Sequence, residues 1–429
     1  MKRIFNARIH TGSHRFFLLL CAVLLFPAIS FAQSNQAEKL LRFKYKIGDN
    51  YRVLSTMNES VKVNGRLSHV AEIVNRVSAS ITDVDKNGRG LNEATFITME
   101  NSTLAGSTGA LTYGEEYESK YWRDHRGIFE IGKQYFMPVV RDVPILPEKP
   151  VKPGDTWTAN GHEAHDLRRS FANNEPFIVP FTATYTYLRD EEGVSSDSKH
   201  EKKTFQVLQV KYTLSFESPV PENAYSLGED FPVSTMGYSN QTLWWDNEKG
   251  QLDHYSEDFK IVMETFYGTM LDFTGKAHAE VTEFERTATE ENLAVVMEKV
   301  KDLDLQDVSV TKSEKGLTIS IENIQFKANS AVLLDSEKQK LNKIAKIIEG
   351  FPNDLLISGH TALSGTPESC QVLSEERADS VAQYLIKTGV RDKYHVYTQG
   401  FGAKVPIASN ATPEGMAKNR RVEITILDK

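Results

Sequence analysis

Cysteine is almost absent from this chain, which has two cysteines in 429 residues. One of them, Cys21, lies in an apolar N-terminal stretch, and Cys370 would be alone if that stretch were removed. A single cysteine forms no intramolecular disulfide, so the folded protein must be held together by packing. Because 40% of the residues are hydrophobic and 25% are charged, the composition is that of a chain with folded cores.

The chain also lacks long hydrophobic runs after its N-terminus, and it lacks an excess of positive charge. No later segment approaches the run of about 18 apolar residues that a transmembrane helix needs. The formal net charge is −8, and removing the four cations of residues 1–32, which hold no acid, would bring it to −12. An acidic protein repels nucleic acid, so we expect no nucleic-acid partner.

Residues 1–32 have the pattern of a cleaved secretory signal peptide. Basic residues precede the apolar stretch 16–26, which is too short to span a bilayer, and the small residue Ala32 suits a cleavage site. An uncleaved anchor is the alternative. Lipid attachment at Cys21 is disfavoured because the preceding Leu20 is not small. The segment predicts export to the periplasm, with outer-membrane association left open.

Residues 33–285 read as an all-β, antiparallel region. In residues 204–216 apolar and polar side chains alternate, which is typical of a half-buried strand. Asn64-Gly65 and Asn87-Gly88 lie between such runs and predict hairpin turns. The proline-rich stretch 144–157 predicts a loop or a boundary between sub-sheets. The pattern is compatible with a flat sheet and with one curved into a half-barrel.

From Thr289 onwards helical periodicity appears, so the whole chain is predicted to be α+β. Residues 286–312 are predicted to connect the domains through a helix and a strand, and residues 313–429 to form a β-α-β-α-β sandwich. We expect helices capped by Thr289, by Ser336 with Gln339 as a capping box, and by Thr366 followed by Pro367.

Motifs for metal binding or catalysis are weak. Residues 83–88 resemble the start of a calcium loop, but the twelfth position is Ala94 and a hairpin turn is the better interpretation. His162-Glu163-Ala164-His165 has the wrong spacing for a zinc motif and is predicted to be a solvated loop. We therefore expect no cofactor, no metal site and no enzymatic activity.

Arg377 is the charged residue whose position is most unusual. At 100° per residue it falls within the same arc of its helix as Cys370, Leu373, Val381 and Leu385. An unpaired guanidinium in such an apolar stripe is costly, so it must reach water, an internal carboxylate or an anionic ligand.

Several motifs in residues 313–429 together resemble the OmpA-like, peptidoglycan-associating domain family. The motifs, in chain order, are Phe326 with Asn329-Ser330, Gly359-His360-Thr361, Leu373-Ser374 with Arg377-Ala378, Gly400-Phe401-Gly402, Pro406, Asn410, and Asn419-Arg420-Arg421-Val422-Glu423. The resemblance implies a binding site for the peptidoglycan stem peptide at Asn329, Thr361, Ala362, Arg377 and Arg421.

Within that resemblance, position 362 departs from the family pattern. The family sequence is His-Thr-Asp, whose aspartate holds the amine of a diamino acid while the arginine at position 377 holds its carboxylate. Here Ala362 supplies no charge, and Cys370 replaces a family asparagine. Losing one charge-assisted hydrogen bond costs about 1.5–3 kcal/mol, so we expect peptidoglycan binding to be weakened or lost.

The predicted role is that of a non-catalytic cell-envelope protein in envelope structure or protein interaction. One alternative is a peptidoglycan anchor with altered stem-peptide specificity, using Arg377, Asn329 and a nearby acid such as Glu368. The other is an outer-membrane β-barrel over residues 33–285, tethered to the wall. Beyond peptidoglycan, other envelope proteins or the outer membrane are the expected partners.

Overall fold

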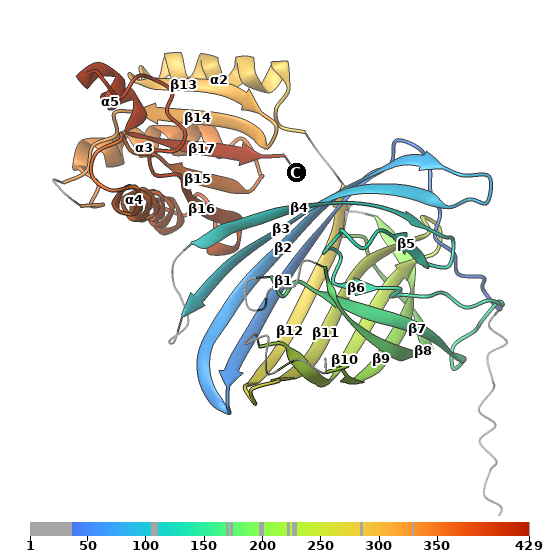
Figure 1. The fold of residues 1–429 in the computed structure, drawn as a ribbon. Helices are drawn as coiled ribbons and strands as arrows, with labels where there is room; N and C mark the ends of the chain where they lie inside the picture. Colours follow the sequence, from blue (N-terminus) through green and yellow to red (C-terminus); the bar gives the residue numbers. More distant parts are fainter. Residues whose placement is uncertain are drawn as a thin grey trace, which may run out of the picture. The chain divides into compact units, whose positions relative to one another are not determined.

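Long antiparallel strands dominate the first two thirds of the described chain (Figure 1). The computed structural model describes residues 37–103, 110–168, 171, 175–196, 201–220, 224, 230–283, 286–327 and 330–428. The predicted signal peptide therefore lies outside the described residues. None of the helices in the described ranges is long and apolar enough to cross a membrane.

One strongly curved sheet runs through residues 50–283 (Figure 1). Its strands pair in the order β7-β8-β9-β10-β11-β12-β1-β2-β3-β4-β5, and every pair in this series is antiparallel. The strands are β1 (Asn50–Val63), β2 (Arg66–Val84), β3 (Gly90–Thr103), β4 (Leu111–Arg123), β5 (Phe129–Ile131), β6 (Val140–Arg141), β7 (Thr156–His165), β8 (Phe177–Val194), β9 (Lys202–Glu217), β10 (Pro232–Asp246), β11 (Gln251–Thr265) and β12 (Met270–Glu283).

Both predicted hairpin turns are formed. Asn64 and Gly65 have φ angles of 51° and 76° between β1 and β2, the left-handed conformation that such tight turns require. Gly88, at φ 77°, closes the turn between β2 and β3, where the carboxylate of Asp85 accepts hydrogen bonds from two backbone N–H groups. The calcium-like segment is thus a hairpin turn.

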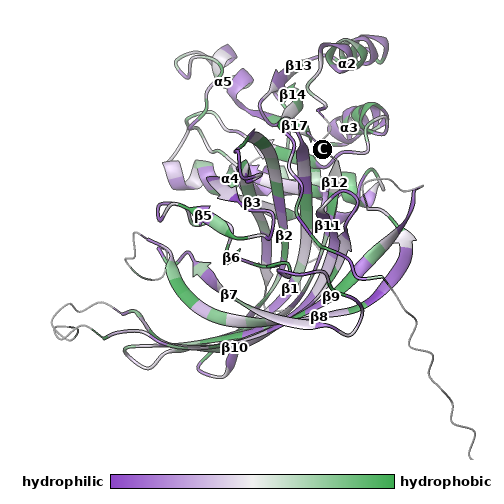
Figure 2. Ribbon diagram, turned by 90° about the vertical axis from the view of Figure 1, so that its right-hand side faces the viewer, coloured by the Kyte–Doolittle hydropathy of each residue, from purple (hydrophilic) through white to green (hydrophobic). Residues whose placement is uncertain are grey.

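Hydrophobic and hydrophilic residues alternate along the strands, as Figure 2 shows. The main core of the sheet region forms where residues 41–45 and 143–151 cover one face of β8, β9 and β10. At its centre Trp245 is fully buried and meets the ring of Phe43 edge-on at 4.7 Å. The proline-rich stretch therefore contributes core residues as well as a loop.

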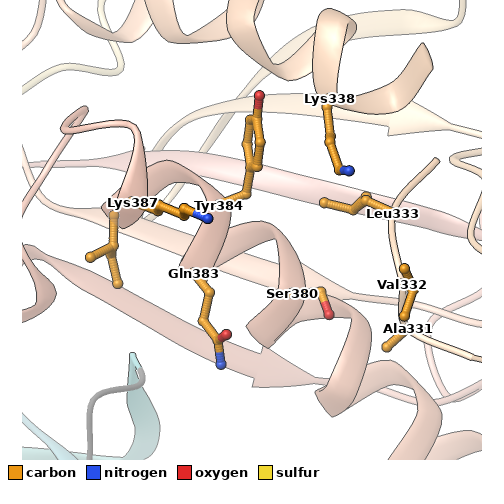
Figure 3. Close-up of a pocket in the computed structure, with 9 residues that line it drawn as sticks. Ala331, Val332, Leu333, Lys338, Ser380, Gln383, Tyr384 and Lys387 are labelled. Carbon is orange, nitrogen blue, oxygen red and sulfur yellow. The ribbon is translucent and has the colours of Figure 1, made fainter. Parts of the chain in front are cut away.

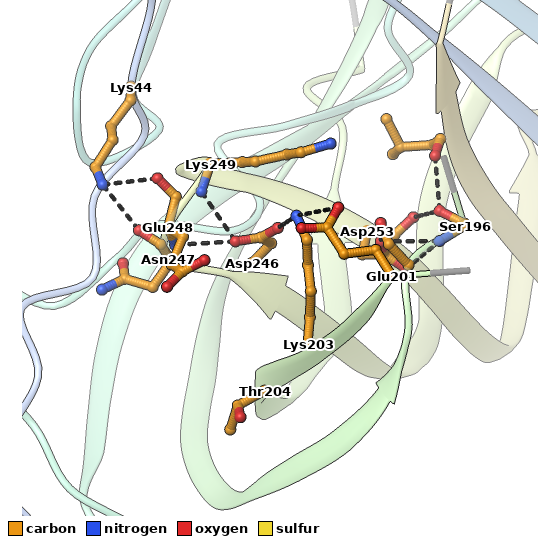
Figure 4. A network of polar contacts seen from close by, with 12 residues as sticks. Lys44, Ser196, Glu201, Lys203, Thr204, Asp246, Asn247, Glu248, Lys249 and Asp253 are labelled. Carbon is orange, nitrogen blue, oxygen red and sulfur yellow. Dashed lines mark hydrogen bonds and ion pairs between the residues drawn. The ribbon is translucent and has the colours of Figure 1, made fainter. Parts of the chain in front are cut away.

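A polar network closes one end of this core (Figure 4). Asp246 ends β10 and accepts hydrogen bonds from the backbone N–H groups of Glu248 and Lys249, each at 2.9 Å. The ammonium of Lys203 on β9 lies 2.8 Å from the same carboxylate, and both side chains are buried. Lys44 donates to two carbonyls of this turn. The network fixes the β10–β11 turn against the N-terminal segment.

The prediction of a solvated loop at residues 162–165 is wrong, because these residues form the end of β7. Glu163 is only 3% exposed, and its carboxylate accepts a hydrogen bond of 2.8 Å from the hydroxyl of Tyr212. The ring of His165 lies 2.9 Å from the other carboxylate oxygen. The sequence does not show the alternation of apolar and polar residues here, because the charged residue Glu163 occupies an inward-facing position.

The C-terminal region combines a mixed sheet with helices that share one hydrophobic core. The strand order is β13-β14-β17-β15-β16, in which only β15 and β16 are parallel. The elements are α2 (Glu290–Asp302), β13 (Val308–Ser313), β14 (Gly316–Glu322), α3 (Asp335–Ile348), β15 (Leu355–Gly359), α4 (Pro367–Lys387), the 3-10 helix η1 (Lys393–His395), β16 (Val396–Gly400), α5 (Pro413–Asn419) and β17 (Arg421–Leu427).

Two of the three predicted helix caps are present. The hydroxyls of Thr289 and Thr366 accept hydrogen bonds from the N–H groups three residues later. The capping box at Ser336 is wrong, since α3 begins at Asp335, two residues before the predicted start, and its N-cap residue, Leu334, makes no side-chain hydrogen bond. Val296 of α2 packs into the same core as α3 and α4, which places the predicted connector in the C-terminal fold.

The buried carboxylate of Asp354 joins the two sheets. It lies 3.3 Å from the guanidinium of Arg76 on β2, 2.7 Å from the ring of His395 and 3.1 Å from the hydroxyl of Tyr397. Burial alone would raise the pKa of Asp354, but Arg76 and the hydrogen bonds from His395 and Tyr397 hold it below its ordinary value. Beside this cluster β16 pairs with β4, with Tyr397 opposite Leu111.

Candidate ligand-binding site

The loop that follows β15 carries the His-Thr-Ala motif and is held by backbone hydrogen bonds. The N–H of His360 donates to the carbonyl of Arg421 at 3.0 Å, and the N–H of Thr361 donates to that of Gly402 at 2.8 Å. Gly359 ends β15 so close to α4 that a Cβ there would lie 2.0 Å from the carbonyl oxygen of Ser374. Glycine therefore lets α4 approach the loop closely.

Ala362 is buried at 4% exposure, and its surroundings contain a second departure from the family pattern. The thiol of Cys370 points at the carbonyl oxygens of Ala362 and Ser364, at 3.7 and 3.3 Å. The cysteine thus packs beneath the loop as a weak donor. Thr361 is 5% exposed and its hydroxyl has no hydrogen-bond partner among the described atoms.

Arg377 lies at the edge of the buried face of α4, not at its centre. The buried residues of this helix are Cys370, Ser374, Ala378, Val381, Ala382 and Leu385. The predicted arc was drawn mainly from large apolar residues, whereas the small side chains of Ser374, Ala378 and Ala382 lie at the centre of the buried face.

The guanidinium of Arg377 stacks on an aromatic ring and has no acid beside it. It lies 4.8 Å from the ring centre of Phe326. Among the described residues no carboxylate forms an ion pair with it, and its buried Nε has no hydrogen-bond partner. Burial, and then the positive charge of Arg420, lower the pKa of Arg377. A half-buried cation in this setting is an attractive partner for an external anion.

The two arginines that begin β17 have different roles. Arg421 is 2% exposed, and it donates to the carboxylate of Glu423 at 2.7 Å and to the carbonyl of Val405 at 3.2 Å. It is therefore part of the interior. Arg420 caps α5 and is the residue whose charge acts on Arg377. The prediction named Arg421 and missed Arg420. Asn329, the remaining predicted site residue, lies outside the described residues.

Glu423 is the acid of this region, and its partners are internal. Its carboxylate lies 3.5 Å from the ring of His360, which stacks on Phe401 at 5.0 Å. Burial would raise the pKa of Glu423, but His360 and Arg421 together lower it to about 2. Glu423 thus stays ionised, but its carboxylate is engaged by Arg421 and His360 and forms no ion pair with Arg377.

Glu423→Gln is expected to destabilise the protein in a pH-dependent way. A carboxyl group whose folded pKa lies below its unfolded value of about 4.3 stabilises the fold above that value, and this contribution is lost as the pH falls towards 2. The variant should lose about 2 kcal/mol near pH 6 and much less near pH 2.5, as measured by urea unfolding. An equal loss at both pH values would assign the effect to packing. The exposed Glu314→Gln serves as the control.

A groove of about 400 Å³ lies one turn further along α4 (Figure 3). Its lining residues are Ala331, Val332, Leu333, Lys338, Ser380, Gln383, Tyr384, Ile386 and Lys387. None of the predicted site residues that the structure describes, which are Thr361, Ala362, Arg377 and Arg421, belongs to this lining. In the described part of the chain no group of three or more histidine, cysteine or acidic side chains is arranged to hold a metal ion.

Comparison with known proteins concerns this C-terminal region. The sequence model of the OmpA family matches residues 325–420. The "Probable lipoprotein YiaD" of Escherichia coli K12 is 40% identical over 121 residues, which are 28% of this chain and 55% of that protein. The "Peptidoglycan-binding protein ArfA" of Mycobacterium tuberculosis is 42% identical over 104 residues, which are 24% of this chain and 32% of that protein. The chain thus covers about half of the first relative's length and about a third of the second's.

Two solved structures match the same part of the chain. An outer membrane protein of Borrelia burgdorferi B31 is 40% identical, with a TM-score of 0.24, and the match covers 28% of this chain and 96% of that one. The peptidoglycan-associated lipoprotein of Burkholderia pseudomallei is 27% identical, with a TM-score of 0.22, over 25% of this chain and 87% of that one. The motifs, the family match and the identity to the first two relatives agree, and residues 325–420 of this chain are therefore an OmpA-family domain.

Proposed function

We propose that this chain is a non-catalytic cell-envelope protein whose OmpA-family domain associates weakly with peptidoglycan. The relatives that match this domain are named as peptidoglycan-binding and outer-membrane proteins, which supports the partner and a periplasmic location. We also propose that residues 1–32 act as the export signal.

The observation that carries this proposal is Arg377, a half-buried guanidinium with no acid partner among the described residues. A carboxylate of the wall peptide would supply the missing negative charge, and a guanidinium can hold it with two parallel hydrogen bonds. Ala362 supplies no matching group for an amine. The group that would hold the carboxylate is therefore present, and the group that would hold the amine is missing. For this reason we expect binding to be weak.

The test is co-sedimentation of the purified protein with peptidoglycan sacculi. Wild-type protein should be retained, and Arg377→Ala should weaken retention by about tenfold, because one charge-assisted interaction is lost. Lys346→Ala, which removes one exposed positive charge from α3, should leave retention unchanged.

Two outcomes would contradict the proposal. Retention that Arg377→Ala leaves intact would place binding elsewhere on the protein. If wild-type protein failed to sediment, the domain would have lost binding and would act as a scaffold for other envelope proteins, a role that the loss of the acid at position 362 also favours.

A further inference from the structure

Two arginines with no acid between them define the electrostatics of the site. Arg420 is the charged neighbour that lowers the pKa of Arg377, next to the effect of burial, and no acidic residue acts in the opposite direction. Neither guanidinium forms an ion pair with a carboxylate in the described ranges. The nearby Glu423 is already engaged by Arg421 and His360. Arg377 therefore has a second cation as its charged neighbour and no carboxylate within ion-pair distance in the described ranges.

The loop after β15, in which the N–H of His360 donates to the carbonyl of Arg421, has neutral groups at Thr361 and Ala362. Ala362 is apolar, and the thiol of Cys370 is directed at loop carbonyls. Thr361 has a hydroxyl that is buried and unpartnered among the described atoms, and a hydroxyl can accept or donate without adding charge. An amide or another uncharged polar group of a ligand fits beside these neutral groups better than an ammonium does.

We propose that the site selects a carboxylate whose neighbouring amine carries no charge because it is acylated. This inference rests on the proposed function and names its ligand more closely. A free ammonium would place a third positive charge near Arg377 and Arg420, with no acid to offset it. Acylation removes that charge and leaves an amide, while the carboxylate remains available to Arg377.

In peptidoglycan, the side-chain amine of the stem-peptide diamino acid is acylated where two stems are cross-linked. The domain would then bind cross-linked stems in preference to free ones. N-acetylation of a stem gives the same local chemistry, so an acetylated peptide and a cross-linked dimer should both bind and a peptide with a free amine should bind poorly. The selectivity would come from the charge of the site.

The experiment compares three ligands by calorimetric titration of the purified protein. They are a stem tripeptide ending in a diamino acid with a free side-chain amine, the same tripeptide acetylated at that amine, and a cross-linked dimer of the stem. The acetylated tripeptide and the dimer should bind about tenfold more tightly than the free tripeptide. Equal affinities, or a preference for the free amine, would overturn the inference.

A substitution at position 362 tests the cause of the preference. Ala362→Asp restores an acid and should reverse the order of affinities, whereas Ala362→Asn has nearly the same size without the charge and should keep the wild-type order. If the aspartate variant does not fold, the order measured with wild-type protein still decides the question. An asparagine variant that reverses the order would show that side-chain size, not charge, sets the selectivity, and would overturn the inference.

Different results would contradict the proposed peptidoglycan association and the proposed selectivity for acylated amines. Loss of sacculus binding contradicts the proposed function itself. Sacculus binding that persists while none of the three peptides binds, or while the free amine is preferred, leaves peptidoglycan association standing and overturns only the selectivity for acylated amines. Arg377→Ala should weaken binding of all three peptides.

Discussion

Replacing Asp354 by alanine is expected to lower the free energy of unfolding by about 3–5 kcal/mol. The substitution removes the partner of Arg76, a guanidinium whose side chain is only 5% exposed, and it removes the acceptor for Tyr397 and His395. A buried charge left without its counterion accounts for most of this cost. Chemical denaturation followed by tryptophan fluorescence would measure it.

Matched variants separate the charge of Asp354 from its hydrogen bonds. Asp354→Asn keeps an acceptor for Tyr397 but removes the charge, so its loss should lie between those of wild type and alanine. Asp335→Ala breaks an exposed ion pair with Lys338 and should change stability by less than about 1 kcal/mol. A loss below about 1 kcal/mol for Asp354→Ala would mean that Arg76 is solvated in solution.

Gly359→Ala is expected to destabilise the protein by about 3 kcal/mol and to weaken sacculus binding as well. The added methyl group would meet the backbone carbonyl of Ser374, which cannot swing aside as a flexible side chain can. Strand β15 and helix α4 would have to separate, and α4 carries Arg377. Thermal unfolding and co-sedimentation with sacculi would measure the two effects.

Gly350→Ala provides the control for this substitution. A Cβ at position 350 would have the flexible end of Lys299 as its nearest neighbour, at 3.2 Å, so little strain is expected. A Gly359→Ala protein with wild-type stability would contradict the close packing of β15 against α4. If stability fell and sacculus binding stayed unchanged, the position of Arg377 would not depend on this contact.

The sequence was most informative where structure is set locally. Alternation and the Asn-Gly turns predicted the hairpins, and the hydroxyls of Thr289 and Thr366 marked two helix starts because capping depends on residues within one turn. The C-terminal sandwich was predicted from such local signals and from family motifs. The partnership of Arg76 with Asp354 was not predictable, since it joins strands far apart in the chain and leaves no periodic trace.

The candidate site could be predicted only in part, because some of its features are local in the sequence and others depend on the fold. Arg377 was identified because a charge in an apolar stripe is visible in the sequence. The sequence could not decide which of Arg420 and Arg421 faces outwards, because that depends on where α5 ends and β17 begins. Glu163 was missed because only the fold places Tyr212 beside it.

The pairing of β4 with β16 also bears on how the chain reaches its folded state. Strand β4 lies in the first third of the sequence, but its partner strand β16 lies near the C-terminus. Until the last part of the chain is in place, the start of β4 at Leu111 and Thr112 lacks this strand partner, and unpaired N–H and C=O groups at a sheet edge are a template for pairing with another molecule. Truncation before β16 should therefore leave a product prone to aggregation.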